Sequence, residues 1–248
     1  MTWLWEIVER DHEIQNPTTP EKIRLLGDYL RLGRESHVLD MACGQGGPAI
    51  VLASAYGCRI LGVESRAEFA GRARTRIAAC GLDSLIEVRT GDAAQFALED
   101  GAWDAALCLG ASFVWGNIRD ATDVLVPAVR AGGFVAVGEP FWRRWPLPEG
   151  VDDEGYVGLD ATLARFTEAG VAVTGLIAAS EDDWDHYESL HWRAVEEWLA
   201  DELEAPVGHD VRLRHERYRG DFFRYKRALL GWGIFIGRRG LAPRAARP

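Results

Sequence analysis

A short glycine-rich turn is the part of the sequence best suited to chemistry. The stretch from Val38 to Met41 is typical of a buried strand, and Gly44, Gly46 and Gly47 follow it directly before a helical stretch. Glycine permits a tight turn, and it leaves the space in which a ligand can approach the backbone closely. We therefore predict that this turn binds a nucleoside-bearing cofactor.

The turn alone leaves two classes of cofactor open. The residues from Gly44 to Ala49 also satisfy the G-x-G-x-x-A form of the dinucleotide fingerprint. A nicotinamide-dependent oxidoreductase is therefore an alternative at this point.

Three carboxylates near the ends of successive strands favour a cofactor with a cationic tail. Asp40 precedes the turn, where it would repel a pyrophosphate but attract an ammonium or sulfonium group. Glu64 ends the second strand, where a carboxylate can accept both ribose hydroxyls, and Asp92 follows the third, where it can accept from an adenine amine. Ordinary structural roles are also open to them: Asp40 as a helix cap, Glu64 as a solvated strand end and Asp92 as an N-cap.

The order of these motifs resembles that of the class I S-adenosylmethionine-dependent methyltransferases. The resemblance covers roughly residues 36 to 139, and five segments carry it: Val-Leu-Asp-Met-Ala-Cys-Gly-Gln-Gly, Gly-Val-Glu-Ser, Gly-Asp-Ala-Ala, Trp-Asp-Ala-Ala-Leu-Cys-Leu-Gly and Ala-Gly-Gly-Phe-Val. The sequence departs from the family pattern at Ala42, where the family usually has the first glycine of its loop. Because a methyl group is a small change, we still expect the cofactor to bind.

The resemblance implies S-adenosylmethionine as cofactor, with S-adenosylhomocysteine as product, and a seven-stranded sheet whose last strand is antiparallel. It implies that the glycine-rich turn approaches the methionine part of the cofactor and that the end of the second strand binds the ribose. It also implies that the end of the third strand binds the adenine, and that a backbone carbonyl at the end of the fourth strand accepts a hydrogen bond from the cofactor's amino group. The predicted cofactor-binding residues are Asp40, Ala42, Gly44, Gly46, Glu64, Ser65, Asp92, Ala93 and Leu109.

The elements that must position these residues follow an α/β pattern. Short apolar runs alternate with longer amphipathic stretches, as in a Rossmann-like parallel sheet covered by crossover helices. We predict strands at 36–41, 59–64, 85–90, 103–109, 133–139, 171–178 and 231–237, and helices near 47–56, 66–80, 118–130 and 159–169.

Two regions lie outside this alternation, although we predict a single methyltransferase domain over residues 1–248. Residues 1–35 should form N-terminal helices, one of them capped by Thr19, while 36–179 and 231–237 form the core sheet. Residues 180–230 should form a helical lid that begins at a capping box, and 238–248 a frayed tail. The aromatic faces of the two lid helices are Trp184, Tyr187, His191, Val195 and Trp198, then His215, Tyr218, Phe222, Tyr225 and Leu229.

The acceptor pocket is expected beyond the carboxyl ends of the fourth and fifth strands. Methyl transfer from a sulfonium is an in-line displacement, which alignment and exclusion of water can promote, and a general base is needed only for a protonated acceptor. The predicted substrate-binding residues are Ser112, Phe113, Trp115, Phe141, Trp142 and Trp184, and the catalytic candidates are Glu139, His191, His186 and Tyr187. The alternative is that the aromatic residues only pack the lid on the sheet, and that His191 is a core histidine and His186 a solvated one.

The composition limits the partners. With 28 Lys and Arg against 38 Asp and Glu, the net charge of −10 disfavours nucleic acid and fits a neutral or cationic small molecule. The N-terminus is not typical of a secretory signal, no apolar run is long enough for a bilayer, and the four isolated cysteines indicate neither a metal site nor disulfides. We expect a cytoplasmic monomer or homodimer. A protein that binds the cofactor without methylating, and a nucleic-acid methyltransferase, remain alternatives.

Overall fold

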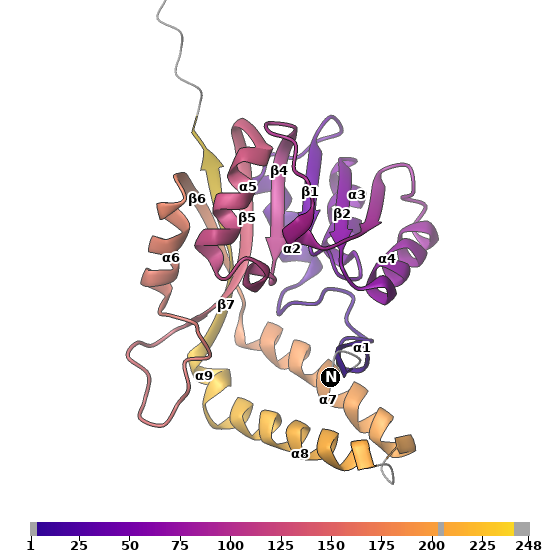
Figure 1. Cartoon of the computed structure of the whole chain (residues 1–248), viewed down its shortest axis with the longest axis vertical. Coiled ribbons are helices and arrows are strands. Elements are labelled where there is room, and N and C mark those ends of the chain that lie inside the picture. The colour runs from indigo at the N-terminus through magenta and orange to yellow at the C-terminus, as the bar shows by residue number, and fades with distance from the viewer. Residues whose placement is uncertain (1–3, 203–205, 241–248) are drawn as a thin grey trace, which may run out of the picture.

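A central sheet organises the part of the chain that the computed structural model describes, residues 4–202 and 206–240. Its neighbours run in the order β3-β2-β1-β4-β5-β7-β6, so within the described residues seven strands form one sheet (Figure 1). The strands are β1 His37–Met41, β2 Arg59–Glu64, β3 Ile86–Thr90, β4 Trp103–Leu109, β5 Val129–Trp142, β6 Val171–Ala178 and β7 Leu230–Arg239.

The strand directions confirm the predicted α/β class. Strands β1 to β5 pair in parallel, whereas β7 pairs antiparallel with both β5 and β6. The order reverses at β1, which has β2 on one side and β4 on the other. In open α/β sheets ligands bind beyond the carboxyl ends of the strands at such a point, and the glycine-rich turn leaves β1 there.

Helices cover both faces of the sheet. The apolar side chains of β1 alternate between two clusters: Val38 packs with the helices of one face and Leu39 with those of the other. Burial of both faces explains why the strands read as nearly continuous apolar runs. The helices are α2 Pro20–Tyr29, α3 Gly47–Tyr56 and α4 Ala67–Ala79 on the first face, and α5 Ile118–Ala128 and α6 Leu159–Glu168 on the second.

Strand β5 is longer than the sequence predicts. It continues past Glu139 to Trp142, and it pairs with β7 from Phe134 opposite Arg238 to Trp142 opposite Leu230. Strand β4 accompanies it only as far as Gly138, so the last residues of β5 have a ladder partner on one side alone. Proline, which cannot donate a ladder hydrogen bond, is tolerated on such a one-sided stretch, and this explains why Pro140 does not end the strand.

The segment between β6 and β7 is helical, as predicted, and forms what we call the insertion, residues 180–230. It contains α7 Glu181–Glu202, α8 Pro206–Asp221, the π-helical turn η3 Phe222–Lys226 and α9 Arg227–Leu229. The predicted capping box is confirmed, because Asp183 N donates to Ser180 Oγ at 3.1 Å and Ser180 N donates to Asp183 Oδ2 at 2.6 Å. Figure 1 shows α7 and α8 beyond one end of the sheet, with α1, Leu4–Val8, beside α7.

The predicted tail begins too early. Arg238 and Arg239 belong to β7, where they pair with β5 and β6, because the antiparallel ladder continues past the apolar run. Residues 241–248 of the predicted tail lie outside the described residues. All four cysteines are free: Cys43, Cys58 and Cys108 are buried, whereas Cys80 is exposed at the end of α4. Among the helices of residues 4–202 and 206–240, none combines the length and apolar character that a bilayer crossing requires.

Candidate active site

The turn after β1 adopts the backbone that a ligand-binding loop requires. Ala42 has a φ of 56°, Gly44 of 56° and Gly46 of 75°, so three positions within five residues are left-handed. Glycine takes this conformation freely, whereas a residue with a Cβ is strained there by about 1–2 kcal/mol. Ala42 therefore carries strain that the usual glycine of the family pattern would lack.

Asp40 is buried on β1, directly before this turn. It is 2% exposed, its Oδ2 has no hydrogen-bond partner, and Gly46 rather than Asp40 occupies the N-cap of α3. The helix-cap alternative is therefore wrong. Burial, together with the nearby Glu64 carboxylate, raises the pKa of Asp40 to about 7. A buried carboxyl oxygen without a partner is the feature that a cationic ligand group would complete.

Glu64 ties the end of β2 to the glycine-rich turn. Its Oε2 accepts from Gly44 N at 3.0 Å, and its Oε1 accepts from Arg66 N at 2.8 Å and from Ser65 Oγ at 3.4 Å. Because Glu64 is only 6% exposed, the solvated-strand-end alternative is wrong. Each carboxylate oxygen has a second lone pair, so the group remains able to accept ribose hydroxyls.

Asp92 adopts the structural role that the sequence left open. Its Oδ1 accepts from Ala94 N at 2.9 Å and caps the short helix η1, Ala93–Gln95, while Ala93 is buried beside it. The cap positions the η1 backbone beyond the end of β3 without using the second carboxylate oxygen of Asp92.

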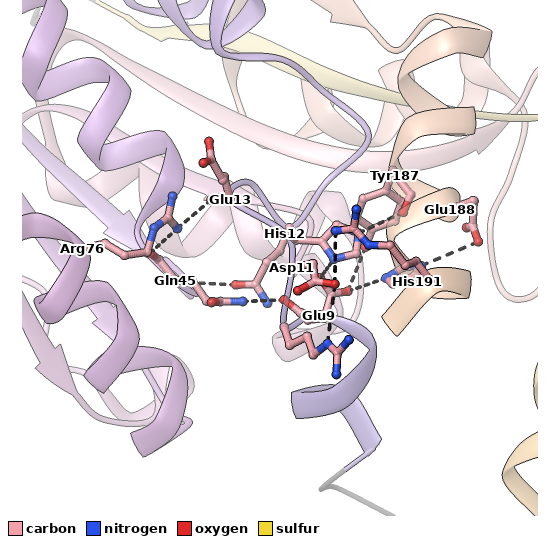
Figure 2. A network of polar contacts seen from close by, with 12 residues as sticks. Glu9, Asp11, His12, Glu13, Gln45, Arg76, Tyr187, Glu188 and His191 are labelled. Atoms are coloured by element: carbon pink, nitrogen blue, oxygen red, sulfur yellow. Dashed lines mark hydrogen bonds and ion pairs between the residues drawn. The ribbon is translucent and has the colours of Figure 1, made fainter. Parts of the chain in front are cut away.

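Residues 9–16, which we expected to belong to the N-terminal helices, instead form an irregular segment that crosses this end of the sheet. Asn16 Nδ2 donates to Leu109 O at 2.9 Å, the carbonyl that the resemblance assigns to the cofactor. Gln15 Oε1 accepts from Gln45 N at 2.8 Å, and Gln45 Nε2 donates to Glu9 O at 2.6 Å. Figure 2 shows the side chain of Gln45, which belongs to the turn, directed at this segment. The segment has no helical or strand periodicity, which explains why no pattern identified it.

A buried acid lies on β5, just beyond the point where β4 ends beside it. Glu139 of β5 is 7% exposed, and Ser112, after β4, donates a hydrogen bond from its hydroxyl to Glu139 Oε2. Burial raises the pKa of Glu139 to about 7, against the opposing effects of the Ser112 hydroxyl and the Arg165 charge. A carboxyl group with this pKa exchanges protons near neutral pH, as a general base must.

The predicted aromatic pocket is only partly assembled. Phe141 and Trp142 lie within β5: Phe141 packs against Phe235 of β7, and Trp142 Nε1 donates to Asp153 O at 2.9 Å. Both side chains belong to the core because β5 continues past the expected strand end. Phe113, by contrast, is 74% exposed.

The remaining aromatic candidates are Trp115, which is partly buried against the second face, and Trp184, which packs into the first-face core. Trp184 therefore has the packing role that the alternative gave it. Its indole nitrogen has no partner, so it also retains a donor for a ligand.

Two of the α7 candidates meet residues of the N-terminal segment. Tyr187 donates from its hydroxyl to Glu9 Oε1 at 3.0 Å, and His191 Nε2 lies 3.0 Å from the same oxygen (Figure 2). Burial alone would lower the pKa of His191. The neighbouring carboxylates of Glu188 and Glu9 have a larger, opposite effect, and the pKa is raised to about 9. His191 is then a proton donor at neutral pH rather than the base expected from its type, and His186 is exposed.

The strand order, the strained turn and the partly unsatisfied carboxyl groups together define a class I methyltransferase. A model of the methyltransferase domain matches residues 38–133. An S-adenosylmethionine-dependent methyltransferase from Thiobacillus denitrificans, solved with S-adenosylhomocysteine, is 32% identical, with a TM-score of 0.87 over 94% of this chain and 96% of that one. The chain belongs to the S-adenosylmethionine-dependent methyltransferases.

Two curated relatives extend the similarity over most of the chain. YjhP of Escherichia coli is 28% identical over 94% of this chain and 96% of its own length. The sarcosine/dimethylglycine N-methyltransferase of Halorhodospira halochloris is 27% identical over 85% of this chain and 77% of its own. S-adenosylmethionine is the methyl donor, and the oxidoreductase alternative is wrong.

Proposed function

We propose that this enzyme methylates a nitrogen or oxygen atom of a small molecule, held between the carboxyl end of the sheet and the insertion, which acts as a lid. The pair of Ser112 and Glu139 carries the proposal, because it places a buried proton acceptor with a pKa of about 7 beside the strand ends. A protonated amine would give a proton to the Glu139 carboxylate, which frees the nitrogen lone pair that attacks the methyl group. A hydroxyl would attack through an oxygen lone pair and pass its proton to Glu139 as the new C–O bond forms.

The residues around the turn fit the cofactor. Asp40 offers an unpartnered buried oxygen to a cationic group, Glu64 offers acceptor lone pairs to the ribose, and the left-handed turn lets the backbone come close. The cofactor supplies a methyl group already activated on a sulfonium. The chain's own task is then to align the acceptor with that group and to exclude water.

Charge and similarity favour the acceptor class. A chain with a net charge of −10 would repel the phosphates of nucleic acid, and one relative is named as an N-methyltransferase of sarcosine and dimethylglycine, which are small amines. A cytoplasmic location and a monomeric or homodimeric state stay predictions.

The acceptor class can be tested with a labelled methyl donor. The purified enzyme is incubated with methyl-labelled S-adenosylmethionine and, separately, with the small-molecule, protein and nucleic-acid fractions of a cell extract. We expect label in the small-molecule fraction, and we expect its loss with Glu139→Gln but not with Glu149→Gln, which changes an exposed acid in the loop after β5. Label confined to nucleic acid or protein would contradict the proposal.

A further inference from the structure

Three metal-ligating side chains meet where the N-terminal segment touches α7. Glu9 and His12 come from the chain just after α1, and His191 comes from α7, 182 residues beyond Glu9 (Figure 2). They are 4%, 2% and 9% exposed. One carboxylate oxygen and one nitrogen of each imidazole lie within 4.8 Å of one another.

The far side of each imidazole faces an acceptor, through a hydrogen bond for His12 and at ion-pair distance for His191. His12 Nε2 lies 2.9 Å from Tyr187 O, and because a carbonyl can only accept, this nitrogen carries the proton and Nδ1 faces Glu9. His191 turns Nδ1 toward Glu188 Oε2 at 3.6 Å and Nε2 toward Glu9. Metal-binding histidines are oriented in this way, with the nitrogen that does not bind the metal directed at a carbonyl or carboxylate.

The outer partners are themselves fixed. Tyr187 donates from its hydroxyl to Glu9 Oε1, and Tyr218 of α8 donates from its hydroxyl to Glu188 Oε1, each at 3.0 Å. The cluster is thus held by residues from α7, α8 and the segment after α1, and its side chains need little reorganisation to accept an ion.

Two buried polar atoms of the cluster face each other without a hydrogen bond. Glu9 Oε2 and His12 Nδ1 are both buried, both lack a hydrogen-bond partner, and lie 3.5 Å apart. With its proton on Nε2, His12 presents a lone pair to a carboxylate lone pair. A cation between the two atoms removes this unfavourable contact, whereas burial of unsatisfied acceptors ordinarily destabilises a fold.

We propose that Glu9, His12 and His191 bind a Zn²⁺ ion that links the N-terminal segment to α7. Binding would release to solvent the proton that His191 otherwise holds between Glu9 and Glu188. Two imidazoles and one carboxylate suit a borderline ion such as Zn²⁺ and do not suit Mg²⁺, which prefers oxygen ligands. With metal–ligand bonds of about 2.0–2.1 Å, tetrahedral ligand atoms lie about 3.3 Å apart.

Each imidazole is near that distance from a different oxygen of the Glu9 carboxylate: His191 Nε2 lies 3.0 Å from Oε1, and His12 Nδ1 lies 3.5 Å from Oε2. One oxygen and one nitrogen of each imidazole lie within 4.8 Å of one another, so a single carboxylate oxygen would have to move closer to one of the imidazoles. The separation between the two imidazole nitrogens is at most 4.8 Å, so it would close by no more than about 1.5 Å. The fourth position would remain open to water or another ligand.

Metal content is the direct test. The full-length protein is stripped with a chelator, reloaded with Zn²⁺, desalted and analysed for metal, and Co²⁺ replaces Zn²⁺ for visible spectroscopy. We expect one ion per chain and ligand-field bands of nitrogen- and oxygen-bound Co²⁺ in the wild type. His191→Gln and Glu9→Gln should lose stoichiometric binding, whereas the control His186→Gln, an exposed histidine of the same helix, should retain it.

A second variant separates a ligand from a positioning residue. Glu188→Gln keeps a side-chain acceptor but removes the charge behind His191, and we expect Zn²⁺ affinity to fall roughly 10- to 100-fold without loss of the site. Circular dichroism checks the fold of each variant. The proposal is overturned if the wild type binds no Co²⁺ or Zn²⁺ stoichiometrically, binds only Mg²⁺, or loses no binding in His191→Gln. The wild-type titration decides even if a variant fails to fold.

Discussion

Two regions meet at the carboxyl end of the sheet, and they are held by different kinds of contact. The turn after β1 is fixed to β2 by contacts between residues that are close in sequence. One of them is the hydrogen bond from Gly44 N to Glu64, twenty residues away. The cover, formed by residues 9–16 and α7, depends on side chains far apart in sequence, such as His191 and Glu9.

The difference indicates which substitutions each of the two regions can tolerate. The turn relies on a left-handed backbone and on the hydrogen bond between Gly44 N and Glu64, so few substitutions can preserve it. The cover relies on side-chain pairs that can be exchanged together. Four predictions test whether the two regions are as separable as this contrast implies.

The largest effect is expected from removing most of the insertion. Replacing residues 182–228 by a short glycine-rich turn would join β6 to β7, which are already antiparallel neighbours. We expect turnover to be abolished while S-adenosylhomocysteine still binds, because the contacts of Asp40 and Glu64 lie in the sheet. Isothermal calorimetry and a methyl-transfer assay measure the two properties. Turnover by the shortened protein would remove the insertion from the mechanism.

The next effect concerns the proposed base. Glu139→Gln should lower kcat by roughly 10²- to 10⁴-fold. Because only the carboxylate accepts a proton, kcat/KM of the wild type should rise as pH increases through about 7 and then level off. Ser112→Ala removes a hydrogen bond that favours the carboxylate, so it should shift this rise to higher pH. A pH profile of Glu139→Gln that matches the wild type would exclude Glu139 as the base.

A smaller effect is expected at the ribose. Glu64→Ala should weaken cofactor binding by about 1–3 kcal/mol, or roughly 5- to 150-fold, through loss of charge-assisted hydrogen bonds. Glu87→Ala, which changes an exposed acid of β3, should leave the affinity unchanged. Equal affinity of both variants would show that the ribose assignment is wrong.

The smallest effect concerns the strained turn. Ala42→Gly should raise the free energy of unfolding by about 0.5–1 kcal/mol, because relief of the left-handed strain exceeds the entropy that glycine adds to the unfolded chain. Ala78→Gly, at an exposed position of α4, should instead lower it by about 1 kcal/mol. Thermal or urea denaturation measures both, and a destabilised Ala42→Gly would argue against strain at this residue.

The sequence was sufficient for the features that arise from local pattern. Buried runs located each strand to within a few residues. The antiparallel direction of β7 came from the resemblance to the methyltransferase family and not from any local pattern. The predicted end of β5 was wrong because Pro140 is tolerated only where β5 pairs with one neighbour, β7. Which strands pair there depends on the tertiary structure and not on the local sequence. This error also assigned Phe141 and Trp142 to the pocket.

The cover could not be predicted for a related reason. Glu9, His12 and Gln15 belong to an irregular segment, and their partners lie on the glycine-rich turn and on α7. No spacing within these eight residues encodes a contact with a helix about 180 positions away. His191 and Tyr187 were identified by type, but the acid that they share was not.

The position of the insertion between β6 and β7 has one more consequence. Its two ends leave adjacent antiparallel strands, and Ala179 N donates to Trp232 O at 2.8 Å across the junction. The chain therefore enters and leaves these helices through one narrow stem, at the edge of the sheet opposite β3. A segment joined in this way can be lengthened, shortened or exchanged by gene rearrangement while the strands of the sheet keep their register.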